Sequence, residues 1–123
     1  MMTGFCIGDI SIDCADPPRT REFYAALTGW ERQTLWGCPA LVAEPGLAIL
    51  FMPCDFAYAP PVWPERPGEQ QKQMHFNFQV DDLAAAVAEA LRLGAAKPAA
   101  QYGGKQFVTM LDPEGHPFCL CAK

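Results

Sequence analysis

The sequence predicts an α+β fold built from two copies of a βαβββ module, and three observations support this prediction. The stretches Gly8–Asp16 and Met74–Asp82 both alternate polar and apolar residues and end in Asp. They lie 66 positions apart, which makes Asp9 and His75 equivalent (75 − 9 = 66). Each stretch is followed by an amphipathic segment that stops at a glycine. A repeated strand–helix unit indicates a repeated architecture, because each copy must bury its apolar face against another element.

Capping residues indicate where each of the two predicted helices begins or ends. The first is predicted to begin after Asp16 and to end at Gly29, because Asp is a favoured N-cap, Pro17 suits the first helical position and Gly is the usual residue after a helix. The second is predicted to begin after Asp81 or Asp82. Its apolar residues recur at the i, i+4 and i+8 spacing of a helix stripe: Leu83, Val87 and Leu91.

Three short strands are expected after each helix, separated by proline- and glycine-containing turns. In the first module they are about Trp30–Trp36, Ala40–Ala43 and Gly46–Met52, and in the second about Lys97–Gln101, Lys105–Leu111 and Pro117–Cys121.

The 123 residues are predicted to form one domain, with module one at about 4–53, a proline-rich linker at 54–73 and module two at about 74–123.

Composition excludes several classes of function. The net charge of −5 argues against nucleic-acid binding, which needs a basic patch. No apolar run approaches the roughly 20 residues of a membrane span, and the N-terminus has no signal-peptide pattern. We therefore expect a cytoplasmic protein with neither nucleic acid nor membrane as a partner, whose six cysteines are reduced thiols.

The first strand of each module places its polar residues on one face. Asp9, Ser11 and Asp13 alternate with apolar residues in the first copy, as His75, Asn77 and Gln79 do in the second. Alternate residues of a strand point to the same side, so each apolar face should pack under a helix and each polar face should point away from it.

The sequence resembles the vicinal oxygen chelate superfamily, which includes glyoxalase I, bleomycin-resistance proteins and extradiol dioxygenases. The resemblance covers nearly the whole chain, and the Pro61-x-Trp63-Pro64 linker is most similar to small bacterial glyoxalase-like domain proteins. It implies that the two modules form curved mixed sheets around a cleft. The motifs that carry it are Ala15-Asp16-Pro17, Phe23-Tyr24-x-x-Leu27-x-Gly29-Trp30, His75-Phe76-x-Phe78-x-Val80-Asp81-Asp82-Leu83 and Asp112-Pro113-Glu114-Gly115-His116-Pro117-Phe118.

In the metalloenzymes of this superfamily, one metal has four ligands, two from the first strands and two from the last strands of the modules. The resemblance carries these positions onto Asp9, His75 and Cys119, whereas the last strand of module one offers only Leu50, Phe51 or Met52. This set departs from the family pattern of His, Gln and Glu. We expect no complete metal site; a divalent ion (Zn, Ni, Mn or Fe), if bound, would be held by Asp9, His75 and Cys119.

His75 and Asp9 are the candidate catalytic residues, because an imidazole titrates near neutrality and a nearby carboxylate can orient it. A plain buried ion pair is the alternative. Cys119 and Cys121 are interpreted as small apolar lining and His116 as a turn residue. The expected lining of a ligand-binding cleft is Asp9, Ser11, Phe51, Met52, Trp63, His75, Asn77, Phe107, Cys119 and Cys121.

Three functions remain open, and the sequence does not decide whether the protein is an enzyme. The favoured one is a glyoxalase-like small-molecule-binding protein without a complete metal site. The alternatives are a metal-dependent lyase, isomerase or dioxygenase acting on a vicinal-oxygen substrate, and sequestration of a bleomycin-type antibiotic, for which the net charge is the sole support. A homodimer is expected from the resemblance and from the open sheet edges.

Overall fold

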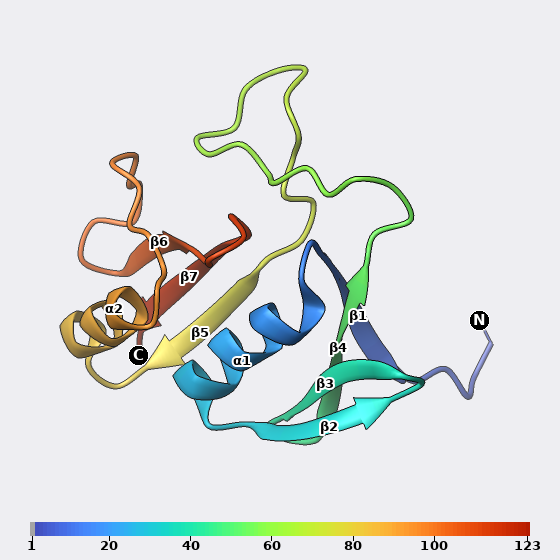
Figure 1. Ribbon diagram of the computed structural model, residues 1–123. Coiled ribbons are helices and arrows are strands. Elements are labelled where there is room, and N and C mark those ends of the chain that lie inside the picture. The colour runs from blue at the N-terminus through green and yellow to red at the C-terminus, as the bar shows by residue number, and fades with distance from the viewer. Residues whose placement is uncertain (1) are drawn as a thin grey trace. The chain divides into compact units, whose positions relative to one another are not determined.

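The computed structural model describes residues 2–123 and divides the chain into two compact units, one ending at Tyr58 and the other spanning Ala59–Lys123. Each unit contains one helix and one mixed β-sheet, and their arrangement can be followed in Figure 1. The mixed α+β class predicted from the sequence is confirmed. Among the described residues, no helix has the length and apolar character that crossing a membrane requires.

The first unit is a four-stranded sheet with one helix against it. Its elements are β1 (Asp9–Cys14), α1 (Pro17–Thr28), β2 (Glu31–Leu35), β3 (Cys38–Ala43) and β4 (Leu47–Pro53), and the strand order is β1-β4-β3-β2. β1 pairs in parallel with β4, and the other neighbours are antiparallel. Helix α1 contacts β3, β4 and β1.

Helix α1 begins and ends where the sequence predicts. The Asp16 side chain accepts a hydrogen bond from the Arg19 N–H at 3.2 Å. Gly29 has a left-handed φ of 73° and donates its N–H to the Ala25 carbonyl at 2.8 Å. A side chain would strain that conformation, so glycine is the residue that lets the chain leave the helix here.

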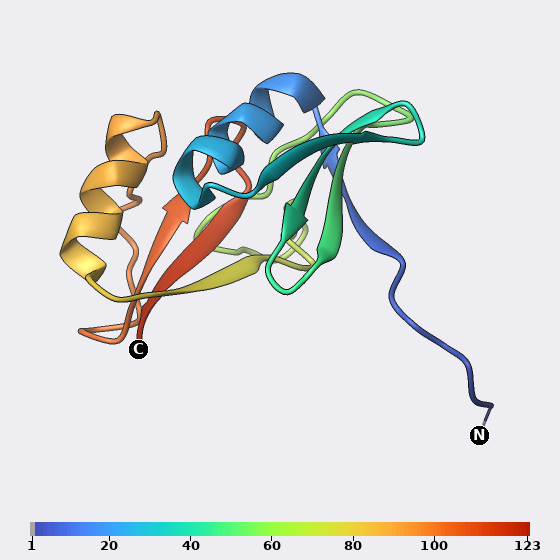
Figure 2. The same cartoon turned by 90° about the horizontal axis from the view of Figure 1, so that it is seen from below.

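The second unit repeats the arrangement with one strand fewer. It contains β5 (Phe76–Val80), α2 (Leu83–Arg92), β6 (Phe107–Leu111) and β7 (Pro117–Ala122), in the order β5-β7-β6. β5 and β7 are parallel, as β1 and β4 are. Asp82 caps α2 by accepting from the Ala85 N–H at 3.0 Å. Figure 2 shows each helix lying along its own sheet.

The predicted strand Lys97–Gln101 is wrong. Only Ala96 forms a bridge, to Leu111 of β6. The next hydrogen-bonded position of this antiparallel register would pair residue 98 with Thr109, but Pro98 has no N–H to donate.

The Gln101 side chain takes the place of the missing strand. Its amide nitrogen donates to the carbonyls of Thr109 and Pro98, both at 2.8 Å, and its amide oxygen accepts from the Thr109 N–H at 2.9 Å. This amide therefore satisfies both backbone groups of Thr109, which is 2% exposed.

The second half of the predicted linker belongs to the second unit. The Trp63 indole N–H donates to the Ala100 carbonyl at 2.9 Å. Pro60 packs so closely on Gly115 that a Cβ added there would lie 2.9 Å from the Pro60 Cβ. The linker is thus held at both the 100–102 segment and the turn before β7.

We predict that Gln101→Ala lowers the free energy of unfolding by about 2 kcal/mol, because it removes three hydrogen bonds and leaves the buried backbone groups of Thr109 unsatisfied. Urea titration followed by circular dichroism measures the difference.

The matched control is Gln106→Ala, which truncates an exposed glutamine near the start of β6. We expect this control to stay within about 0.5 kcal/mol of the wild type. Equal effects of the two substitutions would show that the Gln101 amide does not replace strand pairing.

Candidate functional site

The parallel pairing of β1 with β4 sorts the expected site residues of the first unit onto two faces. Asp9, Ser11 and Asp13 are paired with Ala48, Leu50 and Met52, and paired residues of parallel strands share a face. We call the residues Asp9, Ser11, Asp13, Ala48, Leu50 and Met52 the Asp9 face. Met52 therefore lies on the same face as Asp9 and Ser11.

Phe51 lies on the opposite face of this sheet. It is fully buried, and its ring stacks on Tyr24 of helix α1 with centroids 6.0 Å apart. Successive residues of a strand point to opposite sides, so Phe51 and Met52 cannot line the same surface. Phe51 belongs to the core of the unit.

Asp9 is half-buried and accepts a hydrogen bond from the Ser11 hydroxyl at 3.2 Å. The β4 residue beside it is Ala48, followed on the same face by Leu50. Neither offers a ligand atom, so the first unit supplies one carboxylate at the position that the resemblance marks for a metal.

The second sheet presents a corresponding face, which carries several of the expected residues. Asn77 is paired with Cys119 and Gln79 with Cys121, while Thr109 and Phe107 flank the same two cysteines on β6. We call the residues Asn77, Gln79, Phe107, Thr109, Cys119 and Cys121 the Asn77 face. Both carboxamides are exposed, whereas Thr109 and Cys119 are buried.

His75 lies one residue before β5 and is exposed. Continuing the β5–β7 register places it beside Pro117, with Cys119 two residues further along and opposite Asn77. His75 and Cys119 therefore occupy successive positions along the sheet and do not form a cross-strand pair.

The two cysteines of β7 are free thiols in a protected setting. The Cys119 sulfur lies 3.5 Å from the Thr109 hydroxyl oxygen. Burial, and secondly the nearby Cys119, raises the pKa of the Cys121 thiol. A raised pKa disfavours the thiolate, which is the form that attacks electrophiles and binds metals. This supports the interpretation of Cys121 as lining.

Trp63 lies against its own unit. Besides donating to Ala100, its ring is 5.8 Å from the Tyr102 ring, and the Lys72 ammonium lies 5.3 Å from the indole centroid. Lys72 also forms an ion pair with Glu65. The sequence predicted Trp63 as lining of a ligand-binding cleft; within the second unit its ring lies on the 100–102 segment.

A tight Asp–His pair occupies the turn between β6 and β7. The ring nitrogen Nδ1 of His116 lies 2.8 Å from one carboxylate oxygen of Asp112 and 3.0 Å from the other. The sequence predicted a turn role for His116 but not this pairing. The Asp-x-x-x-His spacing across a Pro–Gly turn is the signal that could have indicated it.

Comparison with known proteins identifies the family. The model of the glyoxalase-like domain matches residues 9–121. No curated protein matches the sequence.

Solved structures share the fold at low identity. A glyoxalase/bleomycin resistance protein/dioxygenase family enzyme from Burkholderia phytofirmans PsJN is 17% identical, with a TM-score of 0.69 over 94% of this chain and 97% of its own. A glyoxalase-related enzyme from Fulvimarina pelagi is 14% identical, with a TM-score of 0.66 over 96% and 88%. The oxidase ChaP-H2 is 15% identical, with a TM-score of 0.67 over 98% and 95%. With its repeated strand–helix units and this match over residues 9–121, the chain belongs to the glyoxalase-like domain family of the vicinal oxygen chelate superfamily.

Proposed function

We propose that this protein binds a small molecule, that the polar sheet face of each unit is a candidate binding surface, and that binding does not depend on a complete metal centre. The observation that carries the proposal is the repeated register: β1 and β5 each place polar side chains on one face and less exposed apolar side chains on the other. These polar residues occupy equivalent positions in the two copies. They do not pack in a hydrophobic core, so a ligand can reach them.

The chemistry of the two faces favours an amphipathic ligand. The Asp9 face combines carboxylates with the half-buried apolar side chain of Met52, and the Asn77 face combines carboxamides with the half-buried Phe107. Mostly apolar surfaces with a few placed polar groups are typical of small-molecule sites. Carboxylates accept hydrogen bonds and attract positive charge, so a ligand with donor groups fits the Asp9 face best.

His75 and Asp9 remain the proposed acid–base residues, and Trp63 and Cys119 remain proposed lining. The register supports a metal-independent role for the first two, because each faces apolar residues on the neighbouring strand. The metal-dependent alternative needs three or four donor atoms around one ion. Nothing in either sheet register favours that set.

We further propose that the protein is a homodimer and that it is located in the cytoplasm. β1 and β2 are the edge strands of the first sheet and β5 is one edge of the second, and open edges favour pairing with another copy. Six free thiols fit a reducing compartment.

We predict that ligands identified by a thermal-shift screen keep their affinity in EDTA, and that the double substitution Asn77→Ala with Gln79→Ala weakens them about tenfold. The two carboxamides are exposed, so their loss removes ligand hydrogen bonds with little effect on folding. Isothermal titration calorimetry measures both effects.

Gln106→Ala, which truncates another exposed amide of the second unit, is the matched control and should leave affinity unchanged. The proposal would be overturned if EDTA abolished binding and zinc, nickel, manganese or iron restored it. That result would establish the metal-dependent alternative.

We also predict that the alkylation rate of Cys121 by iodoacetamide reaches its half-maximum at a higher pH in the folded protein than in urea. Its pKa is raised in the folded state, so less thiolate is present at any given pH. Mass spectrometry of the alkylated peptides follows the rate.

The exposed thiol of Cys6 is the internal control, and we expect its rate to change little on unfolding. Coincident pH profiles for Cys121 in the two states would contradict the half-buried setting that we assign to it.

A further inference from the structure

We infer that the turn between β6 and β7 binds a divalent transition-metal ion, with His116 and Glu114 as ligands and Asp112 as the residue that orients the imidazole. The site is distinct from the strand positions discussed above. It stands independently of the proposed small-molecule function.

Asp112 stabilises this turn through hydrogen bonds to its side chain and its backbone. Its side chain is fully buried, and one of its carboxylate oxygens accepts from the N–H groups of Glu114 at 2.9 Å and His116 at 3.0 Å. The backbone closes the same loop, because the Asp112 N–H donates to the His116 carbonyl and the Gly115 N–H donates to the Asp112 carbonyl, both at 2.9 Å. The residues between are therefore held in one conformation.

The His116 ring is oriented by the same carboxylate. Both oxygens of Asp112 lie within 3.0 Å of Nδ1, which keeps the proton on that nitrogen and assigns the ring's electron pair to Nε2. A carboxylate behind a histidine is the usual partner of a metal-ligating imidazole, where it fixes the tautomer and raises the basicity of the ligand. The His116 side chain is 16% exposed.

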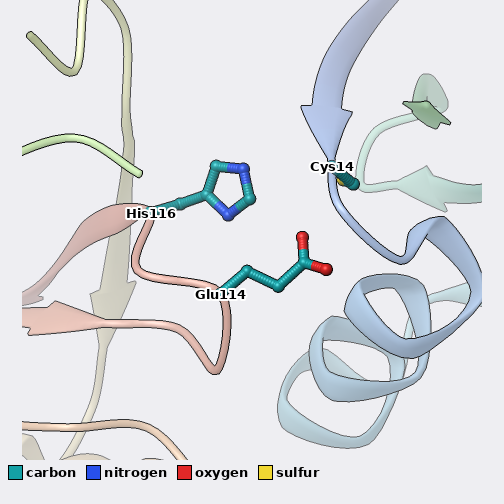
Figure 3. A group of neighbouring side chains, drawn as sticks. All are labelled: Cys14, Glu114 and His116. Carbon is teal, nitrogen blue, oxygen red and sulfur yellow. The ribbon is translucent and has the colours of Figure 1, made fainter. Parts of the chain in front are cut away.

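Glu114 supplies the second donor from the same turn. Figure 3 shows its side chain extending alongside the His116 ring. One of its carboxylate oxygens and a ring nitrogen of His116 lie within 4.8 Å of each other. Two atoms that each bind one ion at about 2 Å are at most about 4 Å apart, so a small rotation of the glutamate side chain completes the pair.

The donor types select the ion. Imidazole nitrogen with carboxylate oxygen suits zinc, nickel or cobalt, whereas magnesium and calcium prefer oxygen alone. Two protein donors leave further coordination positions for water or another ligand. We therefore expect an exchangeable ion and not a structural one.

The test is zinc titration of the full chain, comparing the wild type with His116→Ala, Glu114→Gln and His75→Ala. The chain has two histidines, so each is the control for the other. Calorimetry should show zinc affinity falling about tenfold or more in His116→Ala, falling also in Glu114→Gln, and unchanged in His75→Ala. In the wild type, zinc should shift the ¹⁵N resonance of Nε2 in His116, and thiol binding elsewhere would not produce that change.

The inference is overturned if zinc leaves the His116 resonance unchanged and neither His116→Ala nor Glu114→Gln lowers the zinc affinity. The Asp112–His116 pair would then only close the turn. If circular dichroism shows that His116→Ala does not fold, the inference is tested by the zinc affinity of Glu114→Gln and by the response of the wild-type His116 resonance to zinc. Loss of zinc in His75→Ala alone would place the ion at the strand position. That outcome would contradict both this inference and the metal-independent proposal, whereas failure of the small-molecule screen would leave the inference standing.

Discussion

The parallel pairing of first and last strand in each unit is the constraint on which the rest of the structure depends. β1 with β4 and β5 with β7 are joined through a helix, and that helix must cover one face of the sheet it crosses. One face of each sheet is thereby committed to core, as the Tyr24–Phe51 stack shows. On the opposite faces, Ser11 of β1 and Asn77 and Gln79 of β5 are exposed, so both units present polar side chains to the solvent.

The elements that the sequence predicted correctly are those specified by neighbouring residues. Asp16 and Asp82 cap their helices because a side chain and an amide two or three residues away suffice for the interaction. Strand alternation is equally local. The expected strand Lys97–Gln101 failed because a proline at its second position breaks the ladder, and Gln101 then completes β6 with its side chain. The proline is a local signal against a strand, whereas the pairing of Gln101 with Thr109, eight residues away, is not visible in a local pattern.

The alternation of polar and apolar residues predicted one part of the candidate site, namely which residues share a strand face. Alternation placed Asp9 with Ser11 and Asn77 with Gln79, and the sheet registers agree. It could not place Phe51, because the exact residue that begins the alternation on β4 depends on its pairing with β1. The Asp112–His116 pair depends on how one turn closes, which composition does not reveal. Membership of the family fixes the fold, while the ligand depends on side chains that family members need not share.

The most direct test of the central claim is a ¹H–¹⁵N NMR map of the protein with a ligand from the screen, recorded without metal. If the polar faces bind the ligand, the largest shift changes fall on Ser11 and on the side-chain amides of Asn77 and Gln79, and helices α1 and α2 stay unperturbed. Changes centred on the helices, with Ser11, Asn77 and Gln79 silent, would contradict the assignment of ligand binding to these two faces.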